Sequence, residues 1–285
     1  MQNALSDREL LESLAPVVET NLARHIAAAA EWQPHDYVPW SDARNFEFLG
    51  GTDWDPSQSE LSEVAKTALT VSVLIADNLP AYHRELGKYL RTGHWWRWVG
   101  RWTAEENRHE ILIRNYLTVT RAVDPIALER MRMQHMTDGF RRPPMHLPDV
   151  LAAWAFEESA AAIRHRTTAT LAGDVIVATI ADRLAADDEL QAVFFANLVA
   201  AALDLIPDQT VRAIADRIAD FHTPVVQLSD GRTSDEVLAE AGIYDRANEA
   251  ELVFRPLLEQ WNIFTRTDFG EEGEKARAEL AHLRG

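Results

Sequence analysis

Hydrophobic and polar residues alternate along most of this chain with the period of an α-helix. Few segments show the period-two pattern of Val, Ile and Thr that a half-buried strand requires. Apolar residues recur at spacings of three and four over residues 5–30, 60–91 with an interruption at Pro80, 93–121, 125–137, 147–172, 174–205, 207–221, 245–260 and 271–283. We therefore predict an all-α fold.

Residues 31–59 interrupt this pattern. They contain three prolines and two glycines, but also six aromatic side chains: Trp32, Tyr37, Trp40, Phe46, Phe48 and Trp54. A disordered linker is poor in aromatic residues, so we expect an ordered segment packed on the helices. We expect one domain over 1–285, with an N-terminal helix and aromatic segment (1–59), a helical core (60–221) and C-terminal helices (222–285).

Composition excludes several classes of function. The net charge of −17 argues against nucleic acid and anionic lipid as partners, and the absence of cysteine excludes disulfides, thiolate catalysis and iron–sulfur clusters. No long uncharged apolar stretch predicts a membrane span, and we expect a cytoplasmic protein. The arginines at 91, 97, 101 and 108 are interpreted as solvated helix flanks.

The most informative stretch is TAEENRHE at 103–110, where Glu106 precedes His109 by three residues. The same helical face carries Val99, Trp102, Ile113 and Leu117, so an acid and an imidazole face an apolar core. Burying both without partners costs several kcal/mol, about 2–7 for each polar group. A Glu-x-x-His step on a bundle helix is a known way to bind iron or manganese.

Counting from the predicted turns indicates which side chains share a level. Glu158 and Asp188 each lie 15 residues from Gly173, so they occur at one height in two antiparallel helices. The same count from the turn at Thr92 and Gly93 places Glu106 level with residues 76–78. The sequence thus predicts a four-helix bundle with Glu106, His109, Glu158 and Asp188 in one layer.

A di-iron carboxylate bundle needs a Glu on each of two helices and a Glu-x-x-His pair on each of the other two. This chain has one complete pair and Glu158. The second pair corresponds to Asp188-x-x-Gln191, in which Asp is one methylene shorter than Glu and Gln is a poor replacement for imidazole.

Five motifs carry a family resemblance: WQPHDY at 32–37, DWDPSQS at 53–59, DNLPAYH at 77–83, RWTAEENRH at 101–109 and VDP at 123–125. They resemble the soluble acyl-[acyl-carrier-protein] desaturases, of plastid and especially actinobacterial type. The resemblance implies a homodimeric, ferritin-like helical bundle with additional flanking helices. It also implies an acyl chain bound on acyl-carrier protein, and a double bond introduced with O₂ and a reduced ferredoxin-type donor at a di-iron centre.

The resemblance can be carried over residue by residue. It implies metal ligands at Glu106, His109, Glu158 and Asp188, whereas Ala76 and Gln191 stand at ligand positions usually held by Glu and His. Ala161 replaces a Thr associated with oxygen handling. Trp32, His109 and Asp187 match residues thought to conduct electrons to the metals in plant members.

Three metal contents remain open: two ferrous ions bridged by Glu106 and Asp188, a single metal bound by Glu106, His109 and Asp188 or Glu158, or no metal with a protonated His109. Three functions also remain open. The first is a desaturase-type enzyme with a weakened centre, and the second is a silent protein that binds acyl-carrier protein or an active paralogue. The third is a ferritin-like oxidase of iron or peroxide.

Other candidates have simpler interpretations. We expect His165 to be a satisfied core or dimer-interface histidine, His83 to serve local packing, and Glu279 with His282 to have no function. The tryptophans at 95, 96, 98 and 102 have helical spacing, which is typical of a core with an interface edge.

Overall fold

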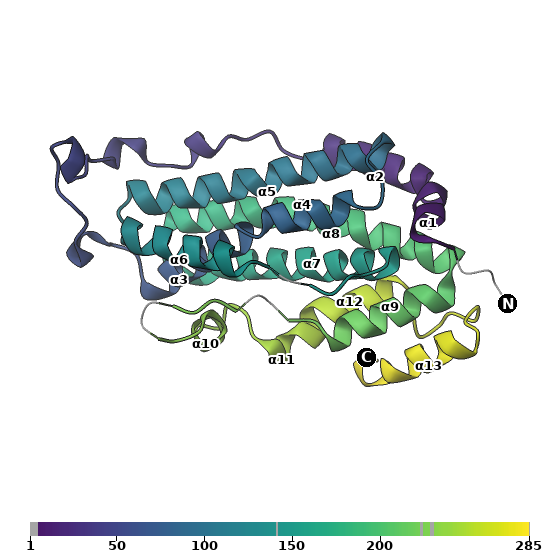
Figure 1. Cartoon of the computed structure of the whole chain (residues 1–285). Coiled ribbons are helices and arrows are strands. Elements are labelled where there is room, and N and C mark those ends of the chain that lie inside the picture. The colour runs from purple at the N-terminus through teal and green to yellow at the C-terminus, as the bar shows by residue number, and fades with distance from the viewer. Residues whose placement is uncertain (1–4, 141, 223–224, 229–230, 285) are drawn as a thin grey trace.

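The structure is a computed structural model that describes residues 5–140, 142–222, 225–228 and 231–284. The parts of the predicted regions at 1–4, 141, 223–224, 229–230 and 285 therefore lie outside the described residues. The helices are α1 Asp7–Ser13, α2 Ala15–Ala28, α3 Glu63–Ala76, α4 Leu79–Gly87, α5 Gly93–Val119, α6 Pro125–Asp138, α7 Leu147–Leu171, α8 Val175–Leu205, α9 Pro207–Ala219, α10 Ser234–Glu240, α11 Arg246–Glu249, α12 Arg255–Gln260 and α13 Glu271–Glu279 (Figure 1). Over the described ranges there is no strand, only an isolated bridge between Gln227 and Thr233. The predicted all-α fold is confirmed.

Four helices form the central bundle. α3 packs on α5 and α7, and α8 packs on α5 and α7, so the four contacts close a ring. α7 and α8 make the most extensive pair, joined by a short turn in which Gly173 has a positive φ of 73° and Asp174 caps the first turn of α8. The turn predicted at Gly173 is therefore where the chain reverses.

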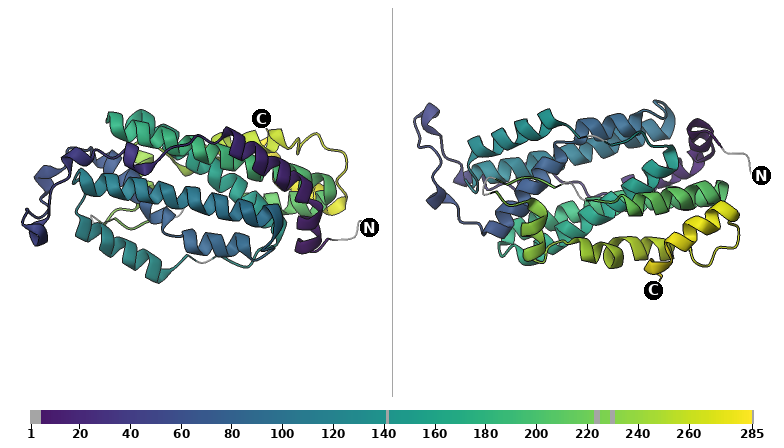
Figure 2. Two further views of the ribbon diagram at one scale, coloured as in Figure 1. Left: turned by 90° about the horizontal axis from the view of Figure 1, so that it is seen from above. Right: turned by 60° about the horizontal axis from the view of Figure 1, so that its bottom comes forward.

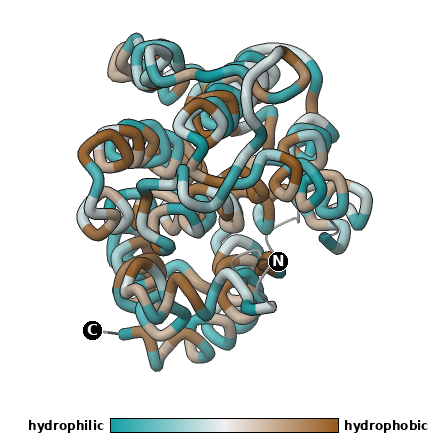
Figure 3. Tube along the Cα trace, turned by 90° about the vertical axis from the view of Figure 1, so that its left-hand side faces the viewer, coloured by the Kyte–Doolittle hydropathy of each residue, from teal (hydrophilic) through white to brown (hydrophobic). Residues whose placement is uncertain are grey.

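The remaining helices cover this bundle on two sides. α2 lies against α5 and α8, whereas α9 and the C-terminal helices lie on the α7 side (Figures 1 and 2). Viewed along the bundle, hydrophobic residues gather on the helix faces that turn towards one another (Figure 3). Large buried aromatic rings fill the centre, and Trp98 stacks on Phe194 with ring centroids 3.5 Å apart.

The first helix differs from the prediction of one element over 5–30. It is divided at Leu14 into α1 and α2, because Pro16 in the first turn of α2 has no N–H with which to continue the α1 hydrogen bonds. At its start, Ser6 caps α1 and forms a capping box with Glu9. At the other end of the chain, α10 was not predicted, and a π-helical turn over Ala250–Phe254 joins α11 to α12.

The aromatic segment is ordered and extends beyond one end of the bundle (Figures 1 and 2). It contains short 3₁₀ turns over Pro34–Asp36, Trp40–Asp42, Glu47–Leu49 and Pro56–Gln58. Arg121, fully buried after α5, donates hydrogen bonds to the carbonyls of Asp53 and Asn45 and lies over the ring of Phe46. The guanidinium therefore organises the backbone of this segment. None of the described helices combines the length and apolarity needed to cross a bilayer.

Candidate metal centre

Three of the four predicted ligands come together between α5 and α8. Glu106, His109 and Asp188 each offer a ligand atom, and these atoms all lie within 4.8 Å of one another. Carboxylate oxygens and imidazole nitrogen are the donors that iron and manganese take in helical bundles. We call these three residues the metal-site triad.

His109 is oriented by a contact on each ring nitrogen. Its Nε2 lies 3.3 Å from Oδ2 of Asp187, while its Nδ1 faces Oε1 of Glu106 at 3.6 Å and Oδ1 of Asp188 at 3.8 Å. A metal-binding histidine typically donates its other ring N–H to a carboxylate, which fixes the tautomer and the ring. The arrangement thus leaves Nδ1 directed at the two triad carboxylates.

Asp187 is itself held by several donors. Trp32 Nε1 and Arg108 each donate to Oδ2 at 2.9 Å, and Arg183 pairs with Oδ1. Burial alone would raise the pKa of Asp187, but the hydrogen bond and charge of His109, with Trp32 and Arg183, lower it to about 2. Asp187 is therefore an anion that links Trp32 to His109, whose rings are also stacked with centroids 6.2 Å apart.

Glu106 has an incompletely satisfied carboxylate. Its side chain is 20% exposed, yet Oε1 is buried and has no hydrogen-bond donor. Burial raises the pKa of Glu106 to about 7, with Asp188 adding to the rise and His109 opposing it. Burial would lower the pKa of His109, but Glu106, Asp187 and Asp188 outweigh it and raise that pKa to about 9. An acceptor oxygen facing a ring nitrogen needs a proton or a metal cation between them, so the residues fit a bound metal.

Glu158, the fourth predicted ligand, does not belong to the group of ligand atoms that lie within 4.8 Å of one another. Its Oε1 accepts a 2.7 Å hydrogen bond from Trp102 Nε1. Burial raises its pKa well above the usual range, and the charges of Glu106 and Asp188 add to the rise. Glu158 therefore interacts electrostatically with the triad, while one of its carboxylate oxygens accepts a hydrogen bond from Trp102.

The two positions that lack the usual ligands are accounted for differently. Ala76 is the last residue of α3, where the chain bends into α4. Gln191 is fully buried, and its amide donates to Oε2 of Glu105 at 3.2 Å while its Oε1 has no partner. The side chain that replaces the second imidazole thus points an amide hydrogen at a neighbouring acid.

Sequence reasoning missed the buried pair beside Gln191. His25 Nε2 lies 2.9 Å from Oε2 of Glu105, and both side chains are almost fully buried. The sequence did indicate that His25 is buried, because it lies on the apolar face of α2 with Val18 and Leu22. Its partner on α5 could not be inferred, because contact depends on how the two helices pack.

The arginine interpretation holds for Arg91 and Arg97, which are exposed, but needs correction for the other two arginines. Arg108, expected as a solvated flank, is 19% exposed, binds Asp187 and lies over the ring of Trp32 at 4.0 Å. Arg101 likewise pairs with the buried Glu105. These side chains are drawn inward because buried carboxylates lie one turn or one helix away.

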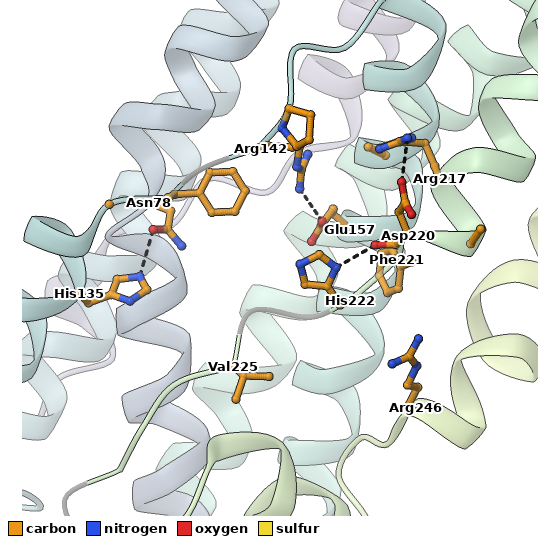
Figure 4. A pocket seen from close by; sticks show the side chains of 15 residues that line it. Asn78, His135, Arg142, Glu157, Arg217, Asp220, Phe221, His222, Val225 and Arg246 are labelled. Atoms are coloured by element: carbon orange, nitrogen blue, oxygen red, sulfur yellow. Dashed lines mark hydrogen bonds and ion pairs between the residues drawn. The ribbon is translucent and has the colours of Figure 1, made fainter.

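A cavity lies on another face of α7. It has a volume of about 740 Å³ and is lined by residues that include Phe140, Ala153, Glu157 and Phe221 (Figure 4). Arg142 pairs with Glu157 in its wall at 2.7 Å. Within the described part of the chain, no triad residue lines this cavity.

The fold and the triad define a helical bundle protein with a carboxylate–histidine centre, and comparisons with known proteins narrow this class. The family model described as fatty acid desaturase matches residues 6–284. "Putative acyl-[acyl-carrier-protein] desaturase DesA1" of Mycobacterium tuberculosis is 41% identical over 99% of this chain and 86% of its own length. "Acyl-[acyl-carrier-protein] desaturase 6, chloroplastic" of Oryza sativa subsp. japonica is 27% identical over 96% of this chain and 71% of its own length.

A solved structure agrees with these relatives. The X-ray structure of DesA2 from Mycobacterium tuberculosis H37Rv matches with a TM-score of 0.79 and 34% identity, over 97% of this chain and 99% of that chain. The chain therefore belongs to the acyl-[acyl-carrier-protein] desaturase family, and the resemblance and ferritin-like fold expected from the motifs are confirmed.

Proposed function

We propose that this protein binds a fatty-acyl chain carried on acyl-carrier protein and holds one metal ion, rather than two, in the metal-site triad. The observation that carries the proposal is the orientation of His109. Its Nε2 is bound to Asp187, and its Nδ1 is directed at the undonated Oε1 of Glu106 and at Asp188. The triad supplies one imidazole and two carboxylates for a single ion, whereas a two-metal centre would lack a carboxylate on one metal at Ala76 and an imidazole on the other at Gln191.

Iron is the metal expected in the triad, with manganese as an alternative of similar ligand preference. Bound ferrous iron would supply the one-electron chemistry with O₂ on which a desaturase depends. The chain's own contribution is to fix the His109 ring through Asp187 and to keep that acid ionised. In this proposal Trp32, Asp187 and His109 also conduct electrons from a ferredoxin-type donor, and two chains form a homodimer.

The acyl chain is placed in the 740 Å³ cavity beside α7. Phe140, Ala153 and Phe221 give it an apolar wall beside charged side chains such as Arg142 and Glu157. Because no triad residue lines the cavity over the described ranges, the arrangement supports acyl binding more directly than ordinary desaturation.

Metal analysis of protein purified without chelator tests the proposal. We expect about one iron or manganese per chain, lost in His109→Asn and retained in the control His83→Ala, whose imidazole binds Thr103 instead. Two irons per chain, both lost with His109, would contradict the one-metal proposal and favour a family-type di-iron centre.

A second candidate is a silent binding protein that sequesters acyl-carrier protein or pairs with an active paralogue. The observation that favours it is Gln191, whose amide is already bound to Glu105. Acyl-carrier-protein titrations of metal-free protein, with mass spectrometry of fatty acids after incubation with O₂ and reduced ferredoxin, distinguish the two. Acyl binding without metal or product would support the silent function.

A further inference from the structure

The two carboxylate oxygens of Asp188 have different surroundings. Oδ1 faces His109 within the triad at 3.8 Å, whereas Oδ2 lies 2.7 Å from Nδ1 of His165. A carboxylate only accepts, so the ring N–H of His165 donates to it. The side chain of Asp188 is 2% exposed, and His165 is its only hydrogen-bonding side chain among the described residues.

His165 is in turn held on its far side. It projects from α7, and its Nε2 lies 3.3 Å from the hydroxyl of Ser72 on α3. That hydroxyl oxygen is also 3.0 Å from the carbonyl of Ala68, one turn earlier in the same helix. The imidazole therefore connects α3, α7 and α8, and both of its nitrogens have a polar partner.

This arrangement resembles the one behind His109. Asp187 holds the ring of His109 from outside the triad, and His165 holds the carboxylate of Asp188 from outside the triad in the same way. Partners of this kind orient metal ligands and tune their affinity, and losing one typically weakens metal binding about 10–100-fold. The carboxylate of an aspartate can rotate about its Cβ–Cγ bond. A hydrogen bond to one oxygen stops this rotation and keeps the other oxygen directed at the metal site.

We propose that His165 is a positioning residue for the metal site: it holds Oδ2 of Asp188 so that Oδ1 faces His109 and Glu106. The consequence for metal affinity rests on the proposed function, but the effect on the triad exists without metal. His165 itself is outside the triad, because the group of ligand atoms within 4.8 Å of one another comprises Glu106, His109 and Asp188.

Cobalt(II) titration of metal-free protein measures the effect. We expect His165→Ala to weaken Co²⁺ binding about 10–100-fold. His165→Asn, whose amide nitrogen can donate from nearly the position of Nδ1, should restore most of the affinity. His83→Ala is the matched control, because it removes a comparable 2.8 Å side-chain contact to Thr103 away from the triad. It should bind Co²⁺ as the unaltered protein does.

Proton NMR of the Co²⁺ protein distinguishes positioning from direct ligation. Each imidazole bound to Co²⁺ contributes one strongly shifted exchangeable ring proton, and we expect one, from His109. A second such signal that disappears in His165→Asn would make His165 a ligand and overturn the proposal. Unchanged Co²⁺ affinity in His165→Ala would overturn it as well.

A metal-free measurement separates this inference from the proposed function. In protein labelled with ¹⁵N-histidine, His165→Ala should shift the ring nitrogens of His109, because Asp188 loses its orientation, whereas His83→Ala should not. If the protein binds no Co²⁺ and this shift is seen, the metal proposal fails and the positioning role stands. If the His109 nitrogens are unaffected, the positioning role is wrong whatever the metal content.

Discussion

At the scale of single residues, the triad joins two groups whose pKa values are both raised. Glu106 has a pKa raised to about 7, chiefly by burial, and His109 has one raised to about 9 because its carboxylate neighbours outweigh burial. In metal-free protein, protonated His109 supplies the positive charge that the neighbouring carboxylates of Glu106, Asp187 and Asp188 require. Metal binding must displace that proton, so the two are alternatives.

The pKa of His109 gives a pH dependence with a definite sign. The pKa of His109 in the folded protein, about 9, exceeds the ordinary histidine value of 6.5, so the native state binds the extra proton. The stabilisation is fully present below pH 6.5 and is lost as pH rises through 9. We expect the unfolding free energy of metal-free protein to fall by at most about 3 kcal/mol over this interval.

Urea titrations at pH 6 to 9.5 measure this loss, with His109→Asn as the comparison. The variant has no group that titrates with the displaced value, so the difference in unfolding free energy between the two proteins should shrink as pH rises. If the unfolding free energies of the two proteins differed by the same amount at every pH, the pKa of His109 would not be raised by folding.

Replacement of Glu106 tests whether its acid serves the metal or the fold. Glu106→Ala removes a partly buried carboxylate with an undonated oxygen, so metal-free protein should keep its unfolding free energy or gain some. With metal present the variant should be less stable than the unaltered protein, because it has lost a ligand and bound metal no longer stabilises its native state. Thermal unfolding with and without Co²⁺ checks both. Marked destabilisation without metal would mean that Glu106 has a structural role.

Sequence could predict the site only as far as local spacing and motif likeness reach. The Glu106 and His109 step follows from helical period, and Trp32 and Asp187 follow from the family motifs. The contacts of Glu105 with His25 and of His165 with Asp188 were not predicted. Each depends on a partner from another helix, and the rotation of one helix against another is decided by side-chain packing that no short spacing encodes.

At the scale of elements, the α7–α8 hairpin positions Asp188 beside α5 and depends on its turn. Gly173 has a φ of 73°, a conformation that costs an L-residue about 1–2 kcal/mol, although a Cβ there would meet nothing within 4 Å. We expect Gly173→Ala to destabilise the protein by about 1 kcal/mol through the backbone alone.

Gly100 provides the matched control for this substitution. It lies inside α5, has no positive φ, and a Cβ there would also meet nothing within 4 Å. Gly100→Ala should therefore stabilise by about 0.5–1 kcal/mol, since alanine favours helix and the unfolded chain loses entropy. Urea denaturation gives both values, and the same sign for the two variants would contradict the argument from φ.

Element boundaries show where period alone fails. The long helices α5, α7 and α8 begin and end within a few residues of their predicted limits, because many turns of one periodic face define them. The break at Leu14 between α1 and α2 was missed, although Pro16 is visible in the sequence. The apolar spacing continues across the break, and it does not show that Pro16 lies in the first turn of a new helix, where proline is common. Short elements such as α10 carry too few turns for a period to be detected.

At the scale of the whole molecule, α7 separates two regions that the family's activity would join. Glu158 and His165 on this helix face the triad side, whereas Ala153 and Glu157 line the cavity. Adjacent residues of a helix point about 100° apart, so one helix can serve both regions without making them continuous. Acyl binding and metal binding should therefore be separable by substitution.

A pair of variants tests this separation. Ala153→Leu adds a branched side chain at a buried position of the cavity wall, and it should weaken binding of acyl-acyl-carrier protein about tenfold or more while Co²⁺ binding changes little. His109→Asn should do the reverse, because its ring touches the triad and not the cavity. Calorimetric titration of both variants with each ligand gives four affinities. If Ala153→Leu lowered both affinities while its circular dichroism and melting temperature were unchanged, cavity and triad would form one continuous site, and the chain would have kept the geometry that oxidation of a bound acyl chain requires.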